Sequence, residues 1–110
     1  MALENSRSLL MRPGMDRILG LLSKRQRRQI LFALNKERVE NESDVVTRDS
    51  DAEKVRLELR HNHLPRLEEA GYIEWDRDTG RISKGPRFQE IQPFLELLEN
   101  HADELPPDWP

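Results

Sequence analysis

Apolar side chains recur at helical spacing through residues 52–70 of this chain. They lie three to five positions apart and form one broad face of a helix: Val55, Leu59, Leu64, Leu67 and Ala70. Gly71 ends this helix, because glycine takes the left-handed conformation of a C-terminal cap without steric cost. The run Tyr72-Ile73-Glu74-Trp75 then alternates apolar and polar residues, which is typical of a strand.

The residues after this strand predict a β-hairpin. Residues 76–80 read Asp-Arg-Asp-Thr-Gly, a turn sequence, and Arg81-Ile82-Ser83 can pair back on the strand. The sequence therefore predicts one continuous unit, a helix over 52–70 followed by a hairpin over 72–83.

The apolar pattern predicts three further helices. The first covers Met15–Leu22, and the second runs from Lys24 to about Glu37 with Ser23 as its N-cap. The last begins at Phe88 and ends near Asn100, and Pro93 either opens this helix or kinks it.

The remaining segments are polar or rich in turn residues. Residues 41–51 are polar and acidic, broken only by Val45 and Val46, so they hold a short helix or a brief strand and loop. Ser50 and Glu53 have the spacing of a capping box for the helix over 52–70. We expect a lead-in over residues 1–14, a domain over 15–85, a C-terminal helix over 86–101 and a Pro-rich tail over 102–110.

Composition limits the core and the environment. The chain has 110 residues, of which 35% are hydrophobic and 35% are charged, so we expect one domain with a lean core that a partner subunit can complete. Cysteine is absent, which excludes disulfides and thiolate metal sites. No apolar run approaches the ~18 residues of a membrane span, and there is no signal-peptide pattern. We therefore expect a cytoplasmic protein that has no contact with a membrane.

Charge is distributed unevenly along the chain. Residues 1–38 carry nine basic and three acidic side chains, a balance of +6, and since the whole chain carries −3 the remainder carries −9. Lys24, Arg25, Arg27 and Arg28 stand at the start of the second helix, where cations oppose the helix dipole. Contact with phosphates explains this arrangement, and the alternative is a merely solvated basic face.

Several stretches of the chain resemble a known family. They are Leu22-Ser23, Arg27-Arg28, Ile30-Leu31 and, most specifically, residues 63–71, His-Leu-Pro-Arg-Leu-Glu-Glu-Ala-Gly. They are similar to haloarchaeal winged helix-turn-helix proteins related to the arsenic-repressor-type (ArsR-like) transcriptional regulators, over about residues 15–85. The resemblance implies an α+β winged helix, with a three-helix core, a β-hairpin wing and a C-terminal helix that forms a homodimer. It also implies a DNA-binding role in transcription regulation.

In such a fold the helix over 52–70 enters the major groove, and its N-terminal half meets base edges. Lys54, His61 and Asn62 lie on its exposed side, with Arg56 and Arg60 at the margins, where they either contact double-stranded DNA or are simply solvated. The other predicted phosphate contacts are basic residues at the start of the second helix and in the wing: Lys24, Arg25, Arg27, Arg28, Arg77, Arg81, Lys84 and Arg87.

Other functions have weaker support in the sequence. His61 and His63 together suggest a metal site, but side chains two residues apart on a helix point in roughly opposite directions. We therefore predict no metal or other cofactor, and we expect His63 to pack at the edge of the core. No motif specifies an enzyme. The competing hypothesis is a winged-helix module that binds a protein partner and not DNA. It is favoured by the charge-neutral helix over 52–70 and the reduced helix before it.

Overall fold

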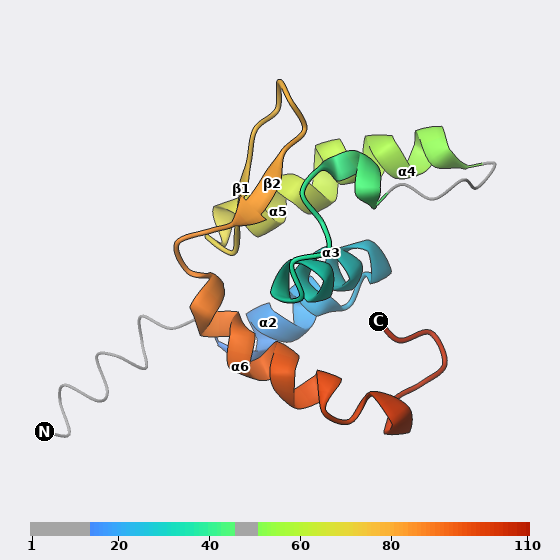
Figure 1. The fold of residues 1–110 in the computed structure, drawn as a ribbon, viewed down its shortest axis with the longest axis vertical. Coiled ribbons are helices and arrows are strands. Elements are labelled where there is room, and N and C mark those ends of the chain that lie inside the picture. The colour runs from blue at the N-terminus through green and yellow to red at the C-terminus, as the bar shows by residue number, and fades with distance from the viewer. Residues whose placement is uncertain (1–13, 46–50) are drawn as a thin grey trace, which may run out of the picture.

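The structure is a computed structural model of the 110-residue chain, and it describes residues 14–45 and 51–110. The predicted lead-in and the predicted cap at Ser50 therefore fall outside the described residues, apart from Gly14. Figure 1 shows helices surrounding a central core, with a β-hairpin and one helix end extending away from it.

The first two helices are α2, Met15–Leu22, and α3, Arg25–Asn35. Both predicted helices are confirmed, and α3 turns Ile30 and Leu31 fully into the core. The prediction that Ser23 caps α3 is wrong. Lys24 occupies the N-cap of α3 without a side-chain hydrogen bond, while the Ser23 hydroxyl donates to the Gly20 carbonyl at 2.6 Å. Ser23 thus closes the end of α2, because the last carbonyls of a helix need external donors.

The predicted helix over 52–70 is present, but it contains an irregular turn. It consists of α4, Ala52–Glu58, a π-helical turn η2, Leu59–His63, and α5, Leu64–Glu69. In the wide turn, the Leu64 N–H donates to the Leu59 carbonyl, five residues earlier. A proline ring clashes with the carbonyl four residues before it in a regular helix. The wider turn in front of Pro65 gives that ring room and lets the helix continue.

The predicted hairpin is confirmed as strands β1, Ile73–Trp75, and β2, Ile82–Lys84. The strands are antiparallel, with Glu74 opposite Ser83. The segment before α4 adds to the edge of the hairpin, since the Ile82 N–H donates to the Glu40 carbonyl at 2.9 Å. A 3-10 turn η1, Glu42–Asp44, follows, so the described part of the polar segment holds only a short helical turn, as the sequence predicts.

Two glycines allow the backbone to pass closely between α5, the hairpin and the last helix. Gly71 has a φ of 82°, which favours glycine, and ends the helical segment as predicted. Gly85 lies against this turn, and its N–H donates to the Tyr72 carbonyl at 2.9 Å. A Cβ on Gly85 would lie 2.4 Å from the Gly71 carbonyl oxygen, so only glycine fits there without a backbone shift.

The C-terminal helix α6, Phe88–Glu99, packs on α3 and buries Phe88, Ile91 and Leu95. Pro93 lies inside α6, so of the two predicted alternatives the structure excludes the one in which Pro93 opens the helix. The Pro-rich tail contains a 3-10 turn η3, Ala102–Glu104, and returns to α3, where the Trp109 ring meets Phe32 edge-on at a centroid distance of 4.3 Å.

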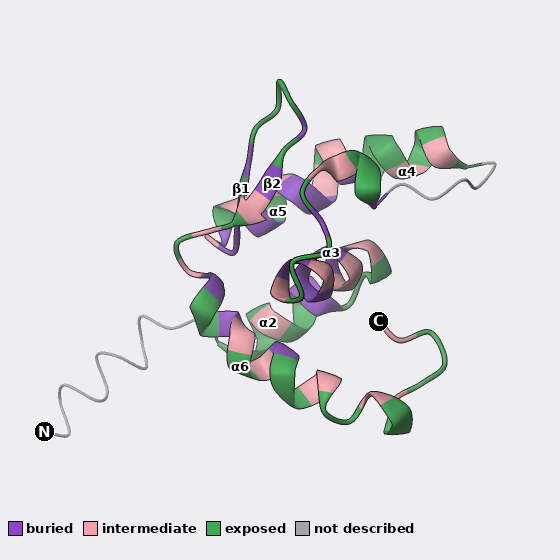
Figure 2. Cartoon of the chain, viewed as in Figure 1, coloured by how far each residue is buried: buried purple, intermediate pink, exposed green. Residues whose placement is uncertain are grey.

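Burial is concentrated where α3, α5, the hairpin and α6 meet, and it stops at α4. Figure 2 shows buried positions in all four of these elements, whereas α4 is exposed or intermediate throughout. The core includes Leu59 of the π turn, and Val55 of α4 packs partly buried against it, while the rest of α4 extends beyond the core (Figure 1).

Candidate nucleic-acid interface

The part of the long helix that projects from the core is the candidate interface. Lys54 and His61 are exposed, and Leu57 is 50% exposed on the same helix. His63 is 4% exposed, which confirms that it packs at the edge of the core while His61 faces solvent. We call the surface formed by Lys54, Leu57 and His61 the outward face. An α-helix with side chains is about 10–12 Å across, close to the width of a DNA major groove at about 12 Å.

One flank of the outward face is formed by the start of α3. Arg27 is only 7% exposed; its Nε–H donates to His63 Nδ1 at 3.0 Å and its Nη1–H to the Gly20 carbonyl at 3.3 Å. Since Nδ1 accepts this bond, His63 is neutral. Burial lowers the pKa of His63, and the nearby Arg27 charge lowers it further. Arg27 was predicted as a phosphate contact, but the structure places it inside the protein, between α3 and the π turn.

The exposed cations on this flank are Lys24 and Arg25. The charge of Lys24 also lowers the pKa of His63, and the bond from Arg27 to His63 joins this end of α3 to the π turn. Asn62 is half-buried and accepts a hydrogen bond from Arg66 Nε at 2.7 Å, which ties Asn62 to a neighbour one turn away. The start of α3 is therefore next to the middle of the long helix.

The opposite flank is a network of ion pairs centred on Glu42. This carboxylate accepts from the Arg60 guanidinium and, at 2.8 Å, from the indole N–H of Trp75. Arg60 also donates to the Arg77 carbonyl at 3.0 Å. Arg77 stacks over the Trp75 ring at 4.3 Å and pairs with Glu68 at 3.1 Å. Two predicted DNA contacts, Arg60 and Arg77, are therefore held by carboxylates of the protein itself.

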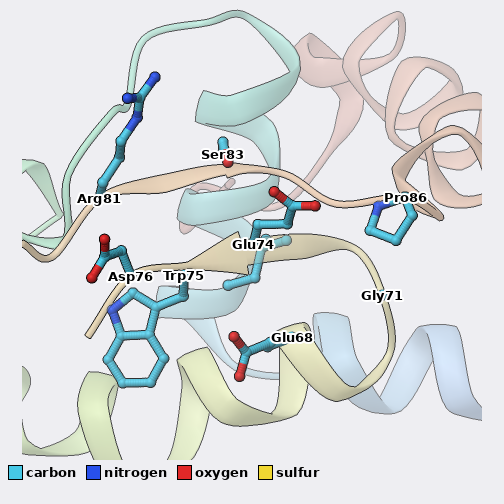
Figure 3. Close-up of a pocket in the computed structure, with 9 residues that line it drawn as sticks. Glu68, Gly71, Glu74, Trp75, Asp76, Arg81, Ser83 and Pro86 are labelled. Carbon is cyan, nitrogen blue, oxygen red and sulfur yellow. The ribbon is translucent and has the colours of Figure 1, made fainter. Parts of the chain in front are cut away.

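The tip of the hairpin is acidic. Asp76 accepts from the backbone N–H groups of Asp78 and Thr79, and these bonds lower the pKa of its carboxyl group. Figure 3 shows a surface pocket of about 660 Å³ beside the strands, lined by Glu68, Glu74 and Asp76 among others. The Arg81 side chain extends away from the Asp76 carboxylate in this view. The lining holds three carboxylates and one arginine, Arg81, so it carries a net negative charge that disfavours phosphates.

Three other predicted contacts have partners within the protein. Arg28 donates to the Leu22 carbonyl at 2.9 Å and lies 3.7 Å from Asp108 in the tail. Arg56 lies 4.0 Å from Glu53, and Lys84 lies 4.0 Å from Glu37. The three ion pairs are long and each involves an exposed side chain, so they restrain their cations only weakly, whereas Arg28 is also held by its 2.9 Å hydrogen bond.

The structure thus divides the predicted cations into an exposed unpaired group, a paired group and one buried arginine. Four exposed side chains have no ion pair in the part of the chain that the structure describes: Lys24, Arg25, Lys54 and Arg81. The paired group is Arg28, Arg56, Arg60, Arg77, Lys84 and Arg87, and Arg27 is buried. Arg17 and Arg66, which line one pocket, were not singled out from the sequence as candidate binding residues. Asn62 and Arg66 are four residues apart on a helix, a spacing that indicates a side-chain contact.

Other kinds of site find no support in the described residues. Within 14–45 and 51–110, no group of three or more His, Asp or Glu side chains is placed to hold a metal ion. No helix in those same ranges has the length and apolar character to span a membrane.

The described residues form an α+β protein: four helices, with α4 to α5 taken as one, and a two-stranded antiparallel hairpin. Residues 19–83 match a family described as a domain of unknown function, DUF7344. This match covers more than half of the chain, and the protein belongs to that family. No curated protein and no solved structure matches the chain.

Proposed function

We propose that this protein is a winged-helix DNA-binding regulator that places α4 and the outward face in the major groove of double-stranded DNA. The observation that carries the proposal is that α4 has no buried residue, while the π turn that follows it contacts the start of α3, where Lys24 and Arg25 are exposed. In a helix-turn-helix protein the N-terminal half of the recognition helix meets base edges. Here that half is α4, with Lys54 facing solvent.

The cations at the start of α3 support the same function. The first turn of α3 holds no acidic residue, and Lys24 and Arg25 oppose the helix dipole there. Helix stability does not account for this arrangement, whereas contact with a phosphate backbone does. In this proposal Lys24 and Arg25 hold the backbone on one side of the groove while Lys54 and His61 face the bases.

We extend the proposal to a homodimer formed through α6. Leu97 is 58% exposed on this helix, and Phe94 is only partly buried against the core. A helix that presents apolar residues to solvent gains stability when a second copy covers them. A two-fold dimer would also present two outward faces to two DNA half-sites.

One observation favours the competing function, a module that binds a protein partner. Glu42 and Glu68 pair with Arg60 and Arg77, so these two cations are not free to contact DNA, and Leu57 is a 50% exposed apolar side chain on α4. In a contact with a protein partner, Leu57 would lie at the apolar centre and the paired charges at the polar rim.

The test is fluorescence anisotropy of the full chain on a random-sequence DNA duplex over a salt series. The variant is the triple substitution Lys24→Ala, Arg25→Ala and Lys54→Ala, chosen because these side chains are exposed and unpaired in the described residues. Each lost phosphate contact reduces the slope of log K against log salt by about 0.9, so loss of the two backbone contacts, Lys24 and Arg25, lowers the slope by up to roughly 1.8.

The matched control is Arg38→Ala, an exposed arginine beyond the opposite end of α3. It should keep the wild-type slope. If the wild-type protein shows no binding at low salt, or if Arg38→Ala weakens binding as much as the triple variant, the proposed interface is wrong. Failure of the wild type to bind would leave the protein-binding function as the stronger hypothesis.

A further inference from the structure

A pocket between α2, α3 and α5 is lined by three arginines from three helices. It has a volume of about 300 Å³, and its lining is Arg17, Gly20, Leu21, Arg27, Arg66 and Glu69. Arg17 and Arg66 are exposed at its rim, and Arg27 is 7% exposed. Three guanidinium groups against the carboxylate of Glu69 leave the lining with a net positive charge.

The positive charge in this pocket is not compensated by the protein. The two acceptors of Arg27, His63 Nδ1 and the Gly20 carbonyl, are both uncharged. The acceptor of Arg66 is the uncharged Asn62 amide oxygen. In the described ranges, no ion pair joins Arg17, Arg27 or Arg66 to a carboxylate, Glu69 included.

An uncompensated guanidinium is costly at this degree of burial. Removing a charged group from water requires a counter-charge or a full set of hydrogen bonds. Burial lowers the pKa of Arg27, and the charge of Arg66 lowers it further, so the two guanidinium groups repel each other. An anion in the pocket would offset both effects.

We propose that this pocket binds a tetrahedral oxyanion of the phosphate class. A guanidinium presents paired N–H donors that match two oxygens of a phosphate, and arginines from three different helices line this pocket. The phosphate group comes either from free inorganic phosphate or from a phosphodiester of nucleic acid. Binding of the free anion does not depend on the DNA-binding function proposed above.

The probe is inorganic phosphate, titrated into the ¹⁵N-labelled full chain with sodium chloride adjusted to hold the ionic strength constant. The Nε–H resonance of Arg27 and the amide resonance of Gly20 report on the pocket. Both should shift along saturable curves, and chloride alone should leave them in place. Arg17→Gln and Arg66→Gln should each weaken phosphate binding about tenfold, the loss expected for one charge-assisted contact.

The matched control is Arg38→Gln, an exposed arginine beyond the end of α3 that does not line the pocket. It should bind phosphate like the wild type. Arg27 is left intact, because its burial makes a folding defect the expected result of changing it. If phosphate produces no saturable shift, or if both pocket variants bind it as the wild type does, the pocket is not an anion site.

A second arm separates the two sources of the phosphate group. Arg17→Gln and Arg66→Gln are measured on the DNA duplex in the anisotropy assay. Reduced affinity in both would identify a DNA phosphodiester as an occupant, while unchanged DNA affinity with lost phosphate binding would identify the free anion. If the wild type binds phosphate but no DNA, the anion site stands and the regulator function fails.

Discussion

Replacing Glu42 tests whether one carboxylate holds the hairpin against the long helix. Only 12% of the Glu42 side chain is exposed, and it binds two partners from different elements, Arg60 of η2 and Trp75 of β1. Glu42→Ala removes both hydrogen bonds at once. It leaves the Trp75 N–H and the Arg60 guanidinium without their shared acceptor.

The magnitude follows from the exposure of each partner. Arg60 is 35% exposed, so its ion pair contributes about 1 kcal/mol after screening by water. The indole N–H of Trp75 donates to the Glu42 carboxylate, and Trp75 is only 7% exposed. A hydrogen bond to a charged acceptor contributes about 1.5–3 kcal/mol. We therefore expect Glu42→Ala to lower the free energy of unfolding by about 3 kcal/mol, which corresponds to a fall in Tm of about 10 °C.

The assay is urea unfolding followed by far-UV circular dichroism, with Glu96→Ala as the control. Glu96 is an exposed glutamate of α6, so its replacement should change the free energy of unfolding by less than about 0.5 kcal/mol. A double-mutant cycle with Arg60→Ala isolates the ion pair from the indole bond. If Glu42→Ala is no more destabilising than Glu96→Ala, the network does not hold the hairpin and this reasoning is refuted.

Three further substitutions test other parts of the structure. Gly85→Ala should destabilise the protein by about 1–3 kcal/mol in urea unfolding, because the new Cβ meets the Gly71 carbonyl; a neutral result would mean that the backbone can move apart. The pKa of His63 is below its unfolded value of about 6.5, so the unfolded state binds more protons and stability falls as the pH drops below that value. His63→Gln should therefore reduce the stability difference between pH 7.5 and 5.5, and an unchanged difference would contradict the assignment. Trp109→Ala removes the edge-on contact with Phe32 and should lower the Tm measured by calorimetry, whereas an unaltered Tm would show that the tail does not stabilise α3.

Local patterns in the sequence were sufficient to predict the elements. Apolar spacing located α2, α3, the helix over 52–69 and α6, since a helix that packs on a core must place apolar residues on one side. Turn residues at 76–80 located the hairpin, and Gly71 marked the end of α5 because its positive φ has a recognisable residue preference. These signals act over a few residues and can be seen without knowledge of neighbours in space.

The sequence did not reveal which cations are available to a ligand. Arg25 and Arg27 look equivalent in a basic run, yet Arg27 is buried against His63, 36 residues away, and Arg25 is exposed. Arg60 and Arg77 were predicted to face DNA, but Glu42 and Glu68 hold them. The pairing of a charged side chain depends on distant segments that the fold brings together. For this protein the sequence determined the elements and their order, and only the tertiary structure decided which charges remain free, because Coulomb interactions depend on distance in space and on exposure to water.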